Sequence, residues 1–148
     1  MEQRSNRAAR ALLALGQGFL THPDNQSLRT ALHQGTLTTS AYFQQLLRLV
    51  YRLIFLITAE ERELLHPERA APSAMSLYQS GYSMRRLRDR STRRSAHDRF
   101  FDLWESVKIV FRGLADGEPR LALPALAGMA ERRHALIVGQ VDVGLVSD

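Results

Sequence analysis

The stretch Tyr42–Leu65 reads YFQQLLRLVYRLIFLITAEERELL and contains neither proline nor glycine, so an unbroken helix is allowed. Between residues 46 and 57 it is mostly apolar, and at 100° per residue its polar side chains gather on one narrow stripe. A helix with so little polar surface must be covered on most sides by other elements. The stretch therefore predicts the central helix, over about residues 40–65, of an all-α fold with about five helices. The stripe consists of Gln44, Gln45, Arg48, Arg52, Phe55, Ala59, Arg62 and Glu63, and Phe55 is its only large apolar member.

Shorter helices are expected on both sides of this central helix. Residues 4–15 predict an amphipathic helix that the glycines of Gly16-Gln17-Gly18 loosen, and Gly35 is a left-handed stop after a second short helix. Residues 67–82, with two prolines and a glycine, read as a connector. A Ser-x-x-Asp capping box at 95–98 opens a clean amphipathic helix that reaches Leu114 and packs on the central one.

Hydroxyl side chains precede two of the expected helices. Thr38, Thr39 and Ser40 offer N-caps for the central helix, and Ser83 caps a short helix that runs from Met84 to about Arg94. The whole helical region, residues 1–128, is expected to form a single domain, and residues 129–148 an irregular or disordered tail in which a lone hairpin is the alternative. The apolar faces predict one buried cluster of Leu53, Ile57, Trp104, Val107 and Phe111.

The charge balance points to an anionic partner. The net charge is +5 and the pI is near 10.4, which favours polyanions and nucleic acid first. The absence of cysteine suits a cytoplasmic protein. The apolar patch near the N-terminus is too short for a signal peptide, and Arg48 and Arg52 interrupt the apolar run of the central helix, so no membrane span is expected.

No catalytic or metal-binding pattern stands out. The five histidines are scattered, and neither a Gly-rich phosphate loop nor a Gly-x-Ser-x-Gly elbow occurs. Glu105-Ser-Val-Lys108 lies on an amphipathic helix, where its charges face solvent. The glutamates at positions 60, 61 and 63 are interpreted as partners of nearby arginines rather than catalytic acids. No catalytic residue and no metal ligand is therefore predicted, and an unrecognised small enzyme remains an alternative.

The segment between positions 85 and 99 is the one stretch that suggests binding. It holds seven arginines, balanced only by Asp89 and Asp98. Guanidinium groups at this density suit phosphate contact, although a solvated helix paired with the glutamates explains the same pattern. Few apolar residues accompany the charges in this segment, which argues against a compact helix-turn-helix domain that reads DNA bases. The predicted DNA-binding residues are Arg85, Arg86, Arg88, Arg90, Arg93, Arg94 and Arg99.

The order of these elements resembles the helical region that precedes the catalytic domain in large bacterial DNA adenine-N6 methyltransferases. These are the type IIG restriction–modification enzymes and the related methylases of the BREX and DISARM phage-defence systems. The resemblance covers about residues 12–128. It rests on LLRLVYRLIFLITAEERELL (46–65), LYQSGYSMRRLRDRS (77–91) and FDLWESVKIVFRGLADGEPRLALPALAG (101–128).

Two departures limit what the resemblance implies. After Gly128 the family pattern is replaced by Met129-Ala-Glu-Arg-Arg, and the S-adenosylmethionine loop and the Asn-Pro-Pro-Tyr-type motif that grips a flipped adenine are both missing. The chain alone is therefore expected to be inactive and to bind no cofactor, although the full-length family uses S-adenosylmethionine.

The resemblance implies a non-catalytic helical module that braces a methyltransferase catalytic domain and contacts the DNA backbone. The chain would then be a truncated gene product, an excised piece or a stand-alone relic of that region. The alternative is a stand-alone helical interaction domain that dimerises and has no nucleic-acid role. An apolar patch left exposed by a missing catalytic domain would favour such self-association.

Overall fold

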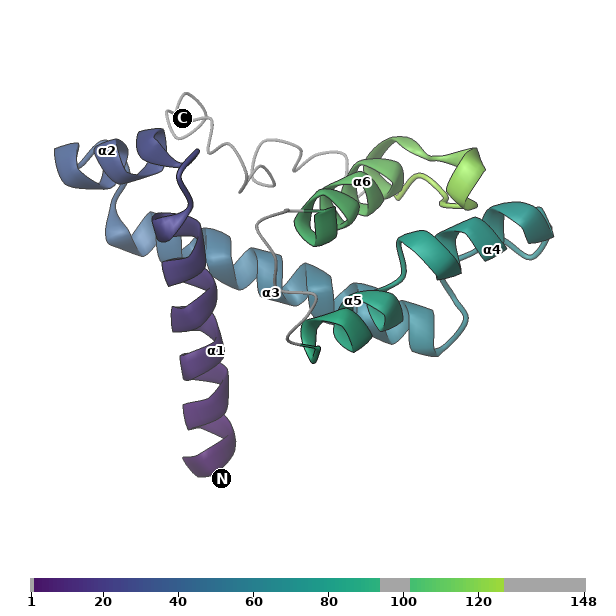
Figure 1. Ribbon diagram of the computed structural model, residues 1–148, viewed down its shortest axis with the longest axis horizontal. Coiled ribbons are helices and arrows are strands. Elements are labelled where there is room, and N and C mark those ends of the chain that lie inside the picture. Colours follow the sequence, from purple (N-terminus) through teal and green to yellow (C-terminus); the bar gives the residue numbers. More distant parts are fainter. Residues whose placement is uncertain (1, 94–101, 127–148) are drawn as a thin grey trace. The chain divides into compact units, whose positions relative to one another are not determined.

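The computed structural model describes residues 2–93 and 102–126, and it confirms the all-α class (Figure 1). The described parts contain six α-helices where the sequence predicted about five. An isolated antiparallel bridge joins Glu118 to Leu123. The predicted tail, residues 129–148, lies outside the described residues. The elements are α1 (Glu2–Thr21), α2 (Gln26–Gln34), α3 (Thr39–Glu61), α4 (Pro72–Gly81), α5 (Met84–Ser91), α6 (Asp102–Asp116) and the 3-10 helix η2 (Pro119–Leu121).

The described residues divide into two compact units, and the boundary falls inside α3. Residues up to Arg52 belong to the first unit, and residues from Leu53 onward belong to the second. The first unit thus contains α1, α2 and most of α3, while the second contains the last turns of α3 with α4, α5, α6 and η2. The expectation of one domain over residues 1–128 stays a prediction.

The core of the first unit forms where α1 and α2 meet the start of α3. The Tyr42 hydroxyl donates a 2.8 Å hydrogen bond to the carbonyl of Gly16. A Cβ at Gly16 would lie 2.8 Å from Leu46 Cδ1, so the missing side chain is what allows this close approach. The buried cluster consists of Leu28, Ala31, Leu37, Tyr42 and Leu46, with Leu12, Leu15, Phe19, Leu20, Leu32 and Ala41 packed against it.

Two predicted helix boundaries, one in each unit, need correction. The first helix does not loosen at Gly16 but continues to Thr21, because the packing of Gly16 against Tyr42 and Leu46 holds the backbone there. The connector predicted over 67–82 contains α4, which begins at Pro72, where the fixed φ of proline suits the first helical turn. The left-handed stop at Gly35 is confirmed, with φ 75°.

The central helix begins as expected and ends earlier than expected. Thr38 Oγ1 accepts the amide of Ala41, which confirms the capping role of Thr38. The predicted end at about residue 65 is wrong because α3 stops at Glu61, followed by Glu63 in the left-handed conformation at φ 56°. The amide of Leu64 bonds the Ala59 carbonyl and the amide of Glu63 bonds that of Glu60, the pattern of a Schellman motif.

The predicted covering of the central helix is wrong for Arg52 and for part of the apolar surface. Arg52, a member of the polar stripe, is 8% exposed. Tyr51 is instead 68% exposed, and three other large apolar residues of the same helix are also at the surface. The exposed side of α3 thus includes most of the polar stripe and extends beyond it onto apolar residues. Its exposed large apolar residues are Phe43, Tyr51, Ile54 and Phe55, and Ile57 is at the margin of exposure.

Burial in the second unit partly matches the predicted cluster. Val107 and Phe111 are each 2% exposed, as expected from the apolar face of α6. Leu53 and Trp104 are half-buried, and Ile57, at 37% exposed, is wrongly assigned to the core. The predicted start of the α6 helix at residue 98 lies outside the described residues. The helix reaches Asp116, two residues beyond the predicted Leu114, and Gly117 follows it with φ 81°.

Candidate nucleic-acid interface

The arginine segment begins on α5, whose first turn is capped by a side chain. Ser83 lies in an extended conformation before the helix, and its hydroxyl oxygen accepts the amide of Arg86 at 3.1 Å. The same hydroxyl donates to the Gln79 carbonyl at 2.9 Å, which ties the cap to the last turn of α4. The predicted N-cap at Ser83 is thus confirmed, while the helix ends at Ser91 rather than near Arg94.

A second cap for α5 comes from the last turn of α3. Glu60 Oε2 accepts the amide of Met84 at 2.8 Å, and its Oε1 accepts the amide of Arg85 at 2.9 Å. The carboxylate thus satisfies two of the amides that a helix N-terminus leaves open, where the helix dipole also favours negative charge. Together with Ser83, Glu60 fixes the start of α5 against the rest of the second unit.

The Glu60 carboxylate also holds α4. The Tyr78 hydroxyl donates to Glu60 Oε2 at 2.9 Å, and the Tyr78 side chain is fully buried. Burial first, and then the negative charge of Glu60, raise the pKa of the Tyr78 phenol. The Tyr78 ring packs edge-on against His66 with centroids 4.9 Å apart, and the His66 Nδ1 lies 2.9 Å from the Ala122 carbonyl. One carboxylate therefore joins α3, α4 and α5.

The structure places five of the seven predicted arginines along one short segment. Arg85 and Arg88 on α5 are exposed, Arg86 and Arg90 are half-buried, and Arg93 is exposed just beyond the C-cap residue Thr92. Arg94 and Arg99 lie outside the described residues. The DNA-binding role of all seven stays a prediction.

The glutamates at the end of α3 neutralise this segment only in part. Arg88 lies 3.5 Å from Glu61, but both side chains are more than half exposed, so the pair contributes little to stability. Among the described residues no ion pair involves the guanidinium of Arg85, Arg86 or Arg93. The predicted pairing of the glutamates with arginines thus holds for Glu61, whereas the contacts of Glu60 go to backbone amides and to the Tyr78 hydroxyl.

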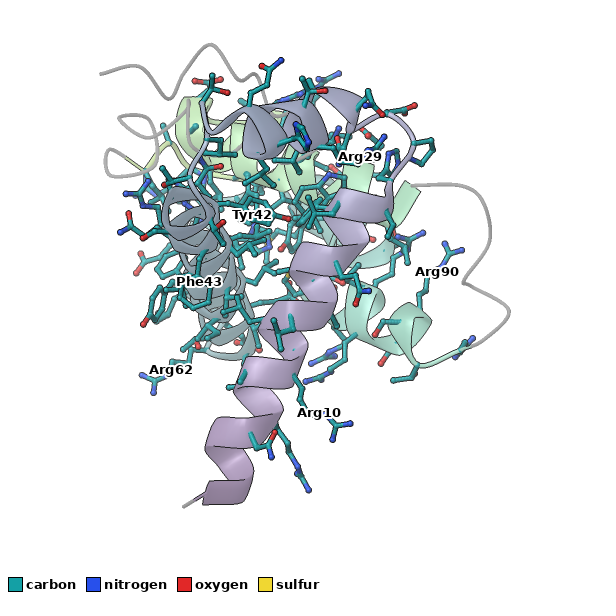
Figure 2. The ribbon with its side chains drawn as sticks, turned by 90° about the vertical axis from the view of Figure 1, so that its left-hand side faces the viewer. Arg10, Arg29, Tyr42, Phe43, Arg62 and Arg90 are labelled. Carbon is teal, nitrogen blue, oxygen red and sulfur yellow. The ribbon has the colours of Figure 1, made fainter. Side chains whose placement is uncertain are left out.

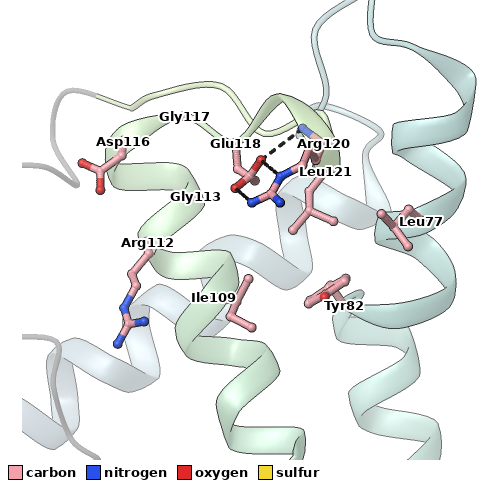
Figure 3. Close-up of a pocket in the computed structure, with 10 residues that line it drawn as sticks. All are labelled: Leu77, Tyr82, Ile109, Arg112, Gly113, Asp116, Gly117, Glu118, Arg120 and Leu121. Carbon is pink, nitrogen blue, oxygen red and sulfur yellow. Dashed lines mark hydrogen bonds and ion pairs between the residues drawn. The ribbon is translucent and has the colours of Figure 1, made fainter.

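A separate hollow of about 410 Å³ opens between α4, α6 and η2 (Figure 3). Glu118 and Arg120 form a bidentate ion pair on the wall of this hollow, with Nε–Oε1 and Nη2–Oε2 distances of 3.0 Å. These hydrogen bonds lower the pKa of the Glu118 carboxyl and raise that of Arg120. Sequence reasoning missed this hollow, because the helix that forms one wall was read as a connector. Its lining is Leu77, Tyr82, Ile109, Arg112, Gly113, Asp116, Gly117, Glu118, Arg120 and Leu121.

Neither a metal site nor a membrane-spanning helix is found in the described parts of the chain. Within residues 2–93 and 102–126 no three histidine or acidic side chains gather in a way that could hold a metal ion. None of the helices there combines the length and the hydropathy needed to cross a membrane.

Comparison with protein-family models, with curated proteins and with solved structures found no match for this chain.

Proposed function

We propose that this chain is a non-catalytic helical module that contacts the DNA backbone through the arginines of residues 85–99. In this proposal it corresponds to part of the helical region of a restriction or phage-defence DNA adenine methyltransferase, as its motifs suggest. The observation that carries the proposal is the double capping of α5 by Glu60 and Ser83, which holds Arg85 and Arg88 at the surface.

A fixed helix is a suitable support for phosphate contact. Because α5 is already ordered, binding costs less conformational entropy than it would for a loose basic segment. Exposed guanidinium groups donate to phosphate oxygens and displace condensed counterions. The Glu60 carboxylate occupies the helix N-terminus, so a phosphate would meet the arginine side chains rather than the open amides.

Removal of the exposed arginines is expected to weaken DNA binding in a salt-dependent way. On a log–log plot the affinity of the wild type should fall with salt by about 0.9 per phosphate neutralised. Changing Arg85, Arg88, Arg93 and Arg94 together to alanine should flatten that slope by about 2–4 units, if most of the four touch phosphate. Fluorescence anisotropy with a labelled duplex measures this slope, and scrambling the duplex sequence should change little.

The control for this experiment is the fourfold lysine variant, which keeps the charge and should keep most of the slope. The opposing interpretation has the arginines serving stability through the glutamates. It predicts that the fourfold alanine variant melts at a lower temperature and that the wild type shows no measurable DNA binding even at low salt. Thermal melting and DNA affinity measured on the same variant separate the two.

Self-association is the second candidate function, and the exposed apolar side of α3 favours it. Phe43, Tyr51, Ile54 and Phe55 recur at helical spacing on this side, and each is about half exposed or more. A second copy of the chain could bury these side chains on the same face of its own α3. In the fragment interpretation, a methyltransferase catalytic domain would cover this face instead.

Introducing a charge on this side tests self-association directly. If the wild type dimerises through α3, Ile54→Glu should shift it to monomer, because an unpaired carboxylate would be buried at the interface. Sedimentation velocity at several concentrations measures the shift. Gln34→Glu, at an exposed position at the end of α2 and away from this face, is the matched control. A wild type that is monomeric throughout the concentration range contradicts this candidate.

A further inference from the structure

Residues 1–52 carry a charge imbalance that the arginines of α5 do not account for. Residues 1–52 contain six arginines and only two carboxylates, those of Glu2 and Asp24. From residue 3 to residue 23, which spans nearly all of α1, there is no acidic side chain. The imbalance therefore lies in a separate part of the chain and in a different helix.

Two of the other arginines in the first unit are engaged in its packing, while Arg48 on α3 is exposed. Arg29 donates to the carbonyls of Leu20 and His22, both at 2.7 Å, and so closes the end of α1. Arg52 is buried. The arginines of α1 are different, because Arg7 and Arg10 are exposed and no ion pair involves either of them in the described part of the chain. Figure 2 shows Arg10 projecting away from the axis of α1.

The outer side of α1 presents hydrogen-bond donors of the kind that bind phosphate, together with the exposed side chain of Leu13. Leu12, Leu15 and Phe19 turn inward onto the core of the first unit. At 100° per residue the opposite side of the helix carries the polar residues, all of them exposed. Amide and guanidinium side chains both donate to phosphate oxygens, and no carboxylate opposes them. We call this set the outer stripe of α1, and it consists of Asn6, Arg7, Arg10 and Gln17.

We propose that the outer stripe of α1 is a second nucleic-acid contact, which binds the phosphate backbone of a duplex independently of α5. A membrane surface is the other anionic partner for a basic helix, but it requires a broad apolar face to insert. In α1 the large apolar residues are engaged in the core, and Leu13, at 71% exposed, is the exception. The stripe therefore fits a phosphate backbone better than a bilayer.

The test compares two variants of the full chain, one that removes the charges of the stripe and one that keeps them, in the anisotropy assay. Arg7→Gln with Arg10→Gln removes both charges and keeps good helix formers, whereas Arg7→Lys with Arg10→Lys keeps the charges. The glutamine variant should flatten the salt dependence by about 1.8 units, at 0.9 per phosphate, and the lysine variant should leave it close to the wild type. Circular dichroism should show the same helix content in all three proteins.

Combination with the α5 variant separates this inference from the proposed function. If both contacts exist, the two reductions in slope add. A flattened slope from the α1 variant alone supports the outer stripe while contradicting the α5 interface. An unchanged slope in the glutamine variant contradicts DNA contact by the outer stripe and does not affect the proposal for α5. Wild-type binding to vesicles of anionic lipid that the glutamine variant loses, without any change in duplex binding, overturns it in favour of a membrane surface.

Discussion

Replacing Glu60 with alanine is expected to lower the free energy of unfolding of the second unit by about 3 kcal/mol. The substitution removes three hydrogen bonds to a charged acceptor, from the Tyr78 hydroxyl and from the amides of Met84 and Arg85. The Tyr78 side chain is fully buried, so its hydroxyl would lose its partner where water has little access. Urea unfolding followed by the fluorescence of Trp104, the only tryptophan, measures the effect in this unit.

The adjacent glutamate provides the matched control. Glu61 is exposed, and among the described residues its carboxylate forms only the 3.5 Å pair with Arg88, so Glu61→Ala should cost less than about 1 kcal/mol. The loss of stability in Glu60→Gln should fall between these two values. The glutamine carbonyl oxygen still accepts a hydrogen bond, while its amide nitrogen, itself a donor, faces another N–H or O–H donor. Equal stabilities for the Glu60→Ala and Glu61→Ala variants would show that the cap does not hold α5 in place.

The first unit is expected to lose stability between about pH 10 and about pH 12, because Tyr42 resists ionisation in the folded state. Burial raises the pKa of the Tyr42 phenol to about 12, above its ordinary value of 10.0. The folded state therefore holds this proton over a pH range in which the unfolded chain releases it. The stabilisation is complete below the pKa that Tyr42 has in the unfolded chain. It disappears as the pH rises through the pKa that Tyr42 has in the folded state. At about pH 11.5 the loss from this residue alone is roughly 2 kcal/mol.

A comparison of phenylalanine variants isolates this contribution. Tyr42→Phe removes the ionisable group together with the hydrogen bond to Gly16, so it should be less stable at pH 9 but lose less stability than the wild type on going to pH 11.5. Tyr51→Phe, at a side chain that is 68% exposed, should follow the wild type. Urea unfolding followed by circular dichroism at the two pH values measures all three. Parallel losses in the wild type and the Tyr42→Phe variant would contradict the assignment.

The local signals in the sequence were sufficient for the helical class and for several helix ends. Gly35 and Gly117 adopt the left-handed conformation because glycine lacks the Cβ that makes it costly, and Ser83 caps α5 because its hydroxyl reaches the open amides. The density of arginines after residue 84 is also visible in the sequence alone. Each of these features depends on residues within a few positions of one another, so the sequence pattern contains the necessary information.

The tertiary structure decided the features that depend on residues far apart in the chain. In the sequence Gly16 indicates a weak point of the helix. In the structure Tyr42 and Leu46 pack against it, and α1 continues to Thr21. Glu60 reads as one of three surface acids, yet its partners lie 18 to 25 positions away.

The exposed side of α3 was decided in the same way. When nearly every side of a helix is apolar, periodicity cannot tell which side is covered, and only the packing of the neighbouring elements does. The sequence by itself determined that this chain forms helices and where several of them begin and end. The tertiary structure determined that Arg52 is buried while Tyr51 and Ile54 are exposed, because burial depends on which surfaces meet.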